Sequence, residues 1–337
     1  MFRLQVQKNK FGKRTIDMQF LRHTICCLSV AILASCSYER VINKSVLDSC
    51  TDSLSLSPVL TDNISGIVLG LLCTSDFIVF CLDNPEFHFA AMPLSFDRPA
   101  FYFGRVGRGP GELVHADFKS IKTSGGNTFS VFDSGQFKNI SLAEDNVTIT
   151  TSDESLKLSG PFNGLKKFGE GYIDVNMQDA NDDFEYVCYD SHGDISGYLS
   201  KYPDWADDSG NKLFCYIKHF ITSEDGNHLA AFYGHFPRAR FISSGSRKVR
   251  TVKLDLPHES ENVLSRRCYV GQPFAAGDII SSLYQGKNYS EIHRWHWDGT
   301  FVKRTVLSSK VSFFCYSQDF RCIFAWDGND ERLYVSQ

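Results

Sequence analysis

Methionine, long apolar runs and the short motifs of common enzymes are scarce or missing in this sequence. Only four of its 337 residues are methionine, and no apolar run reaches the roughly 18 residues that a membrane-spanning helix needs. The Gly-x-Ser-x-Gly, His-Glu-x-x-His, EF-hand and Gly-Lys-Ser/Thr patterns are also absent. These absences exclude the local signatures of serine hydrolases, zinc peptidases, EF-hand proteins and P-loop enzymes. A site whose residues are dispersed along the chain would leave no such signature.

Positive charge is in deficit after the first 35 residues. Residues 1–35 hold six basic residues and one acidic residue, which leaves 29 basic and 38 acidic residues, a formal net charge of −9, for the rest of the chain. Proteins that bind DNA or RNA normally present a basic face to the phosphates. The charge balance therefore argues against nucleic acid as a partner.

The N-terminus has the features of a lipoprotein export signal. Residues 24–34 form an apolar stretch of eleven, which suits the core of a signal peptide but is too short to span a bilayer. The stretch ends in Leu33-Ala34-Ser35-Cys36, which resembles the lipobox of bacterial lipoproteins. A plain secretory signal with a fortuitous cysteine is the alternative. We predict that Cys36 is lipidated, which would anchor the protein to a membrane.

These features set the expected boundaries of the N-terminal region. Residues 1–17 are long and polar for a leader, so Met18 is the expected true start. We expect a signal peptide over 1–35 and a flexible membrane tether over 36–52. The expected location is the cell envelope, and Ser37 after the cysteine is compatible with transport to an outer membrane.

Eight cysteines remain after Cys36, and no Cys-x-x-Cys pair occurs among them. Most lie in apolar, strand-like runs, which favours buried thiols that pack as small hydrophobic side chains. An exported location permits disulfides, but the sequence determines no connectivity.

A short apolar strand, a tight polar turn and a second apolar strand recur six times along the chain. The centres of the second strands lie 44 to 56 residues apart, which leaves room for four strands and their connections. This is the size of one blade of a β-propeller. The turns are residues 74–76, 124–127, 169–171, 224–227, 275–278 and 327–330.

The repeat predicts an all-β fold, a six-bladed β-propeller over residues 53–337. In this interpretation the last repeat stops after its second strand at Gln337 and lacks its outer strands. Residues 53–69 are expected to complete this blade and close the ring, because an exposed edge strand promotes aggregation. A β-sandwich or a two-domain β protein could use the same strands, but neither requires near-regular spacing, and no linker divides the chain.

Residues 104–113 (GRVGRGPGEL) form the densest glycine cluster. A phosphate-binding loop would lead into a helix, whereas this one leads into the strand-like sequence FKSIKT, so no nucleotide or other cofactor is predicted. We interpret Gly107, Gly109, Pro110 and Gly111 as structural residues of the crossover between the first two blades. Gly109 is expected to need a positive φ.

The stretch from residue 103 to residue 142 resembles a blade boundary of the NHL-type propellers. Together with the lipobox, it is similar to the TolB-like six-bladed β-propeller lipoproteins of Bacteroidetes-type bacteria. The resemblance rests mainly on residues 107–112 and on turns such as 224–227. It implies a six-bladed ring and an exported lipoprotein, but no particular reaction, because propellers host unrelated functions.

One face of such a ring carries both the crossovers between blades and the loops between the second and third strands. Function is expected there. That face would present five candidate ligand-binding residues, Arg108, Glu112, Asp204, Trp205 and His235. Trp205 beside acidic residues of the third blade suits a sugar ring or a cationic ligand. A solvated loop surface, or a tryptophan that fills the space between blades, is the alternative.

Two function classes remain. The first is a non-catalytic propeller, anchored to an envelope membrane, that binds a protein, peptide or glycan. The alternative is a metal-dependent hydrolase or lyase with its site in the central channel, whose ligands would come from several inner strands. His293 and His296 do not support a metal site, because side chains three apart on a strand point to opposite faces. No metal ligand is assigned.

Overall fold

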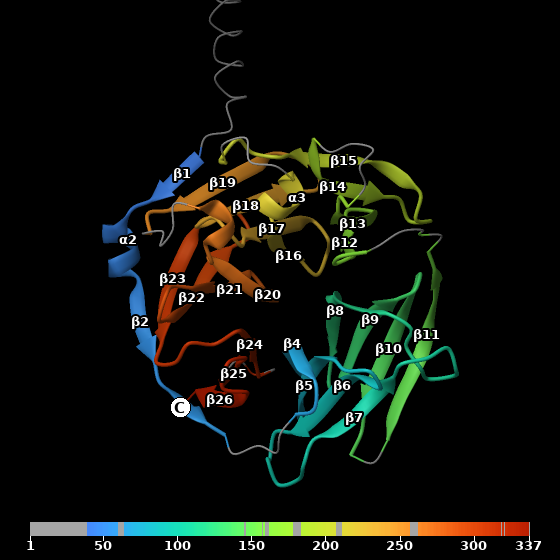
Figure 1. The fold of residues 1–337 in the computed structure, drawn as a ribbon. Coiled ribbons are helices and arrows are strands. Elements are labelled where there is room, and N and C mark those ends of the chain that lie inside the picture. The colour runs from blue at the N-terminus through green and yellow to red at the C-terminus, as the bar shows by residue number, and fades with distance from the viewer. Residues whose placement is uncertain are drawn as a thin grey trace, which may run out of the picture. The chain divides into compact units, whose positions relative to one another are not determined.

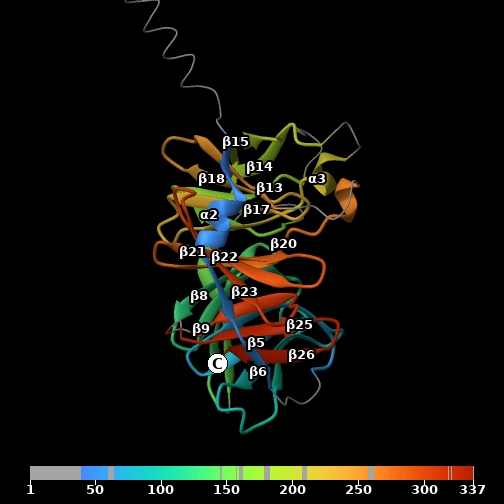
Figure 2. The same ribbon diagram turned by 90° about the vertical axis from the view of Figure 1, so that its left-hand side faces the viewer.

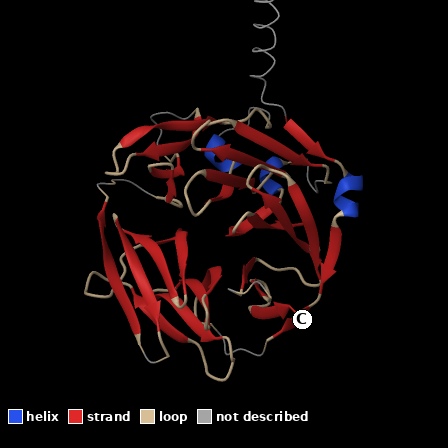
Figure 3. Cartoon of the chain, turned by 180° about the vertical axis from the view of Figure 1, so that it is seen from behind, coloured by secondary structure: helices blue, strands red, loops and turns tan. Residues whose placement is uncertain are grey.

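The computed structural model describes residues 39–59, 64–144, 146–156, 158, 162–177, 183–206, 211–256, 262–317, 319 and 321–336. Within these residues the chain forms six small sheets arranged in a ring, which Figure 1 shows face-on and Figure 2 from the side. The predicted six-bladed β-propeller is confirmed. Seen from behind in Figure 3, strands dominate, and the described helices lie at the ring's outer edge or in crossovers.

Each blade runs from an innermost to an outermost strand. Blade 1 contains β4 (Ile67–Cys73), β5 (Phe77–Asp83), β6 (Phe87–Pro93) and β7 (Phe101–Arg105). Blade 2 contains β8 (Ala116–Gly125), β9 (Thr128–Asp133), β10 (Gln136–Leu142) and β11 (Val147–Ser155). Blade 3 contains β12 (Lys166–Phe168), β13 (Gly171–Val175), β14 (Phe184–Tyr189) and β15 (Ile195–Lys201).

The second half of the ring follows the same order. Blade 4 contains β16 (Lys218–Thr222), β17 (His228–Tyr233), β18 (Arg238–Ser243) and β19 (Val249–Leu254). Blade 5 contains β20 (Tyr269–Ala276), β21 (Ile279–Gln285), β22 (Ser290–His296) and β23 (Phe301–Leu307). Blade 6 contains β24 (Phe313–Tyr316), β25 (Ile323–Asp327) and β26 (Arg332–Ser336). The helix α3 (Lys212–Cys215) precedes blade 4, and the 3-10 turn η2 (Val263–Ser265) precedes blade 5.

Aromatic side chains join each blade to the next. The middle strands are covered on both faces by neighbouring blades, which is why β5 reads as a continuous apolar run rather than an alternating one. Aromatic pairs at such interfaces add packing beyond the area they bury. The ring centroids lie 5.5 Å apart for Phe89–Phe129, 6.0 Å for Phe137–Tyr172, 5.6 Å for Tyr186–Phe220, 5.2 Å for Phe232–Tyr269, 5.4 Å for Phe274–Tyr316 and 5.5 Å for Phe80–Trp326.

A segment that we call the N-terminal strap, residues 39–58, runs along the outer edges of blades 4, 5 and 6 (Figures 1 and 2). β1 (Glu39–Ile42) pairs in parallel with β19, and β2 (Thr51–Leu54) pairs in parallel with β23. Between them lies α2 (Lys44–Ser49), whose first turn is capped by the side chain of Asn43. β3 (Leu56–Pro58) pairs antiparallel with β26 and is the outermost strand of blade 6.

The strap differs from the expected tether over 36–52. Residues 39–52 add strands to two blades and bury Ile42 and Leu47 against blade 4, because the outer edges offer unpaired backbone groups and apolar surface. Residues 53–69 likewise do not act as one closing segment. Their described parts contribute to blade 5, to blade 6 and to the first strand of blade 1.

The predicted position of the sixth turn within its blade was wrong by one strand. The turn over residues 327–330 joins β25 to β26, the second and third strands of blade 6, not the first and second. Its Asp-Gly-Asn-Asp sequence suits any tight hairpin, so turn chemistry alone could not place it within the blade. Blade 6 therefore has three strands of its own before the chain ends, and β3 is the single strand added to it.

All eight cysteines after Cys36 are free thiols, in agreement with the interpretation that favoured packed thiols over disulfides. Six of them are buried, and Cys50 and Cys322 are half-buried. Burial raises the pKa of the Cys315 thiol, and the neighbouring Cys73 adds to the effect. A thiol held protonated in this way is a packing group rather than a nucleophile.

Candidate functional site at the loop-bearing end of the ring

The crossover between blades 1 and 2 is a closed glycine loop. The backbone N–H of Gly107 donates to the Leu113 carbonyl at 2.9 Å, and the N–H of Leu113 donates to the Arg105 carbonyl at 2.9 Å. The Glu112 carboxylate folds back into the loop and accepts from the N–H of Gly109 at 2.7 Å. Glu112 thus holds the loop together from inside, whereas Arg108 is exposed.

The glycines of this loop are needed for two different reasons. A Cβ on Gly107 would lie 2.0 Å from the Glu112 Oε2, and a Cβ on Gly109 would lie 2.9 Å from it. The expected positive φ at Gly109 was wrong, since the left-handed conformations fall on Gly104 (φ 66°) and Gly111 (φ 77°). Gly109 instead leaves room for the carboxylate it binds. Pro110, between them, is exposed.

We expect Gly104→Val to destabilise the fold by about 2–3 kcal/mol and Gly109→Val by less than about 1 kcal/mol. A Cβ at Gly104 would lie 3.0 Å from the Phe89 ring and 3.1 Å from Leu113, both of which are buried. The atoms that meet Gly109 belong to the tip of a flexible side chain, which can swing away. Urea unfolding of both variants and of Arg108→Ala, which should match the parent, measures the difference. A larger loss for Gly109→Val would contradict this account.

Trp205 lies in the crossover between blades 3 and 4, where it packs rather than projects. Its ring is half-buried, with its centroid 4.8 Å from that of Tyr233 and 5.4 Å from that of Phe236. The guanidinium carbons of Arg238 and Arg240 lie 4.8 and 5.0 Å from the Trp205 ring, in cation–π geometry. Trp205 therefore fills space beside blade 4. This agrees with the alternative interpretation of its position, a tryptophan that packs between blades instead of binding a ligand.

Asp204 and His235 border this packed tryptophan. Asp204 is exposed beside it in the crossover, and His235 is half-buried next to Phe236, in the loop between β17 and β18. The Nδ1 of His235 hydrogen-bonds with the Arg266 carbonyl at 2.8 Å, so this nitrogen is the donor and the ring orientation is fixed. The structure thus brings Asp204, Trp205 and His235 to one region, and it places Arg108 and Glu112 in a different crossover.

The expected acidic surface around Trp205 falls largely outside the described residues. This applies to Asp179, Asp182, Asp207 and Asp208. Asp183 is described, and it forms an exposed ion pair with Lys212 at 3.3 Å.

We expect Trp205→Ala to lower the free energy of unfolding by about 2–3 kcal/mol, because it removes aromatic packing and uncovers two arginines. Trp205→Phe keeps a ring between Tyr233 and Phe236 and should lose clearly less. Thermal and urea unfolding of the two variants measure the difference. An unchanged melt for Trp205→Ala would return this residue to the role of an exposed ligand platform.

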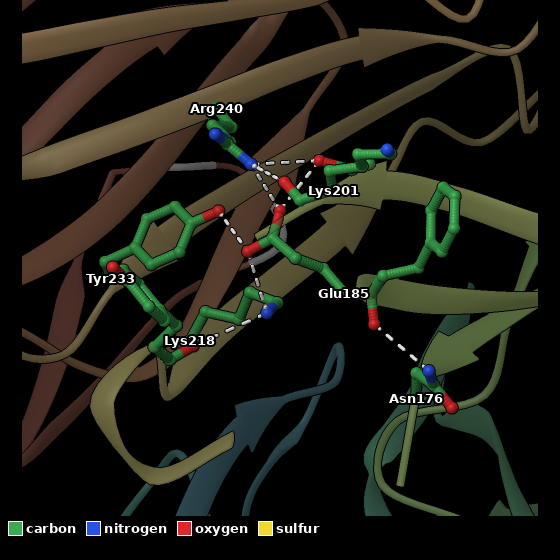
Figure 4. A network of polar contacts seen from close by, with 9 residues as sticks. Asn176, Glu185, Lys201, Lys218, Tyr233 and Arg240 are labelled. Carbon is green, nitrogen blue, oxygen red and sulfur yellow. Dashed lines mark hydrogen bonds and ion pairs between the residues drawn. The ribbon is translucent and has the colours of Figure 1, made fainter. Parts of the chain in front are cut away.

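Arg240 also belongs to a buried charge network centred on Glu185, which Figure 4 shows. The two carboxylate oxygens of Glu185 accept hydrogen bonds from four side chains of blades 3 and 4. These are Ser200 at 2.7 Å, Lys218 at 3.1 Å, Tyr233 at 2.6 Å and Arg240 at 2.6 Å. Burial alone would raise the pKa of Glu185, but the charges of Lys218 and Arg240 outweigh it and the pKa is lowered. The network therefore holds an ionised carboxylate between blades 3 and 4.

A second polar group, which we call the inner-strand cluster, lies where the inner strands of blades 2 and 3 begin, beside Phe220 of blade 4. It comprises Asp117, Lys119, Asn163, Lys166 and Asp174. The Nζ of Lys119 donates to Asn163 Oδ1 at 2.6 Å, and the Nζ of Lys166 donates to the Lys119 carbonyl at 2.5 Å. Asp117 and Asp174 accept the backbone N–H groups of Gly164 and Asn163, at 2.8 and 3.0 Å.

Sequence reasoning missed both polar groups. The residues that meet at Glu185 come from positions 15 to 55 residues away in the chain, so no local spacing reports them. The only local signal was a charged residue within an apolar strand, as in FEYVCY, since a buried charge is rarely left unpaired. His293 of the rejected His-x-x-His pattern is buried and hydrogen-bonds with Glu291 at 2.8 Å.

Among the residues that the structure describes, no three His, Cys, Asp or Glu side chains converge as metal ligands would. No described helix has both the length and the apolar character needed to cross a bilayer.

The fold defines the class of the protein, a six-bladed β-propeller. No protein-family model matches the sequence, and no curated protein matches it. The structure is similar to that of a Bacteroides fragilis protein provisionally described as exported, with 10% identity, a TM-score of 0.49, and coverage of 88% of this chain and 98% of that one. It is also similar to a DUF4221 family member from Bacteroides vulgatus, with 8% identity, a TM-score of 0.45, and coverage of 85% and 98%. Neither likeness bears on the reaction or ligand of this chain.

Proposed function

We propose that this protein is an exported lipoprotein, anchored through Cys36, whose propeller is a non-catalytic binding scaffold for a protein, peptide or glycan in the cell envelope. The lipobox-like sequence and the resemblance to TolB-like lipoproteins support the anchor and an outer-membrane location. Cys36 lies outside the described residues, but Glu39 of the strap follows it by only three positions. Three residues span at most about 10 Å. The anchored ring would therefore lie close to the membrane surface.

The observation that carries the binding role is the oriented ring of His235 beside the exposed Asp204 at the loop-bearing end. His235 is oriented by the Arg266 carbonyl, and Asp204 precedes a tryptophan whose backbone N–H donates to the Tyr216 hydroxyl at 3.1 Å. A side chain that is already held in place, as that of His235 is, loses little conformational entropy when a ligand binds. Rigid strands that present loop residues in this way suit recognition.

We expect Cys36→Ala to abolish the incorporation of a fatty-acid analogue and to release the protein from the membrane fraction. The thiol is the only group in the lipobox-like sequence that can receive the lipid. Cys50→Ala is the matched control, because Cys50 belongs to the described strap and should not affect labelling. Labelling that persists in Cys36→Ala would contradict the anchor.

The binding role is tested with the lipid-free chain, residues 37–337, on a glycan array and on a peptide array. Asp204→Ala combined with His235→Ala should weaken retention of the captured ligand by about 10-fold or more, since central polar contacts typically contribute over 1 kcal/mol. Glu224→Ala, exposed in a turn at the opposite end of the ring, is the control and should bind as the parent does. Equal binding by the double variant and the parent would overturn this assignment of the binding face.

A further inference from the structure

The inner-strand cluster lies at a point where three blades approach closely. A Cβ on Gly164 would lie 3.1 Å from the Phe220 ring of blade 4 and 3.3 Å from the Lys119 Cβ of blade 2. Gly164 also has a φ of 118°, which L side chains rarely adopt. The close approach fixes the backbones from which Lys119 and Lys166 extend.

The two lysines have no counter-ion within ion-pair distance. No carboxylate of the described residues lies within 4.0 Å of either ammonium group; their hydrogen-bond acceptors are the Asn163 amide oxygen and a backbone carbonyl. Each ammonium has three donors, so donors remain on both. Lysines that are partly removed from water are normally paired with an anion.

The nearby carboxylates have other roles. Asp117 and Asp174 are both used to accept backbone N–H groups of the segment that leads into β12. Burial raises the pKa of Asp174 to about 7, so this group is only partly ionised near neutral pH. Burial lowers the pKa of Lys166 to about 8, and the charges of Asp117 and Asp174 do not offset it.

We propose that Lys119 and Lys166, with Asn163, bind the oxyanion of a small ligand, a carboxylate or a phosphate, at the loop-bearing end of the inner strands. The anion would supply a counter-charge within ion-pair distance and acceptors for the remaining N–H groups of both ammonium groups. Ammonium groups recognise oxyanions of either kind as point charges. This inference rests on the proposed binding function and names the chemistry of one ligand group.

The test is a calorimetric titration of the lipid-free chain, residues 37–337, with inorganic phosphate and with glucuronate. Glucose is the neutral match for glucuronate. Binding of phosphate alone assigns a phosphate-bearing ligand, and binding of glucuronate but not glucose assigns a carboxylate-bearing one. Lys166→Met should weaken the binding at least 10-fold, whereas Lys167→Met, an exposed neighbour on the same strand, should not change it. Binding of neither anion, or equal binding of glucose, would overturn the proposal.

A second measurement covers a Lys166→Met variant that fails to fold. Lys119→Met should show the same loss of anion binding, and in the parent the bound anion should slow acetylation of Lys166 by acetic anhydride, measured by mass spectrometry. Acetylation of Lys167 is the internal control. Unchanged acetylation of Lys166 in saturating anion would refute the site. Retention of a glycan or peptide through Asp204 and His235 despite that result would leave the proposed function standing, so the two failures are distinguishable.

Discussion

Glu185→Ala is expected to lower the free energy of unfolding by about 3–5 kcal/mol, because it leaves buried cations without their counter-charge. The carboxylate is fully buried, and Lys218 beside it is almost so. Arg240 loses its only described carboxylate partner in the same change. Urea unfolding monitored by tryptophan fluorescence measures the loss. Asp183→Asn, which breaks the exposed pair with Lys212 two positions away, is the matched control and should leave stability nearly unchanged.

A double variant separates the loss of the carboxylate from the isolation of its partner. Glu185→Leu combined with Lys218→Met removes two opposite charges together, so it should cost less than the sum of the two single variants. Strict additivity would show that the two side chains do not interact, which would contradict the network drawn in Figure 4.

The contribution of Glu185 to the free energy of unfolding should also depend on pH, and the direction of that dependence follows from its pKa. Its pKa in the folded protein is lowered from the ordinary value of 4.5, so the folded state favours the ionised form. The stabilisation is complete above about pH 4.5 and is lost as the pH falls through the lowered folded pKa. The difference in unfolding free energy between the parent and Glu185→Gln should therefore shrink on acidification. A difference that grows below pH 4.5 would contradict the assignment.

Removal of the whole N-terminal strap is expected to cost more than about 5 kcal/mol, a large share of the 5–15 kcal/mol typical of a folded domain. A chain that starts at Val59 lacks β1, β2 and β3, so blade 6 keeps three strands and an unpaired edge at β26. It also loses the buried side chains of Ile42, Leu47 and Leu56. We expect such a chain to lose its cooperative melt and to aggregate, because its edge strands are open to pairing.

The matched control is a chain that starts at Thr51. It keeps β2 on blade 5 and β3 on blade 6 and loses only β1 and α2. This chain should be less stable than the parent but should retain one cooperative transition in calorimetry. Similar melts for the two truncated chains would show that β3 contributes little to the ring, and that the strap acts through blade 4 alone.

Local patterns in the sequence were sufficient for most strands. The turn that precedes β9 and the turn that precedes β17 were placed from glycine, asparagine and aspartate between apolar runs, because these residues suit tight hairpins wherever they occur. The same chemistry misplaced the turn over residues 327–330, which joins different strands of its blade. A hairpin signal identifies a turn but not its position in the repeat.

Part of the candidate site was predictable from local sequence patterns, and part was not. The loop-bearing end follows from strand alternation, so Asp204 and His235 could be assigned to it before the structure was known. The packing of Trp205 could not, because its partners Tyr233 and Arg238 lie in another blade. Gly109 was recognised as structural, but its reason, the carboxylate of Glu112, depends on how the loop folds back.

The sequence by itself determined six blades of short strands, since apolar strands and the turn residues between them act between residues close in the chain. Only the tertiary structure decided that the strap adds parallel strands to blades 4 and 5, that Glu185 is neutralised by Lys218 and Arg240, and that Lys119 and Lys166 lie beside one another with no described carboxylate in ion-pair contact. Edge pairing and charge compensation depend on groups that meet only when distant blades assemble. No local spacing records those meetings, because the energy of each contact belongs to the pair and not to either residue alone.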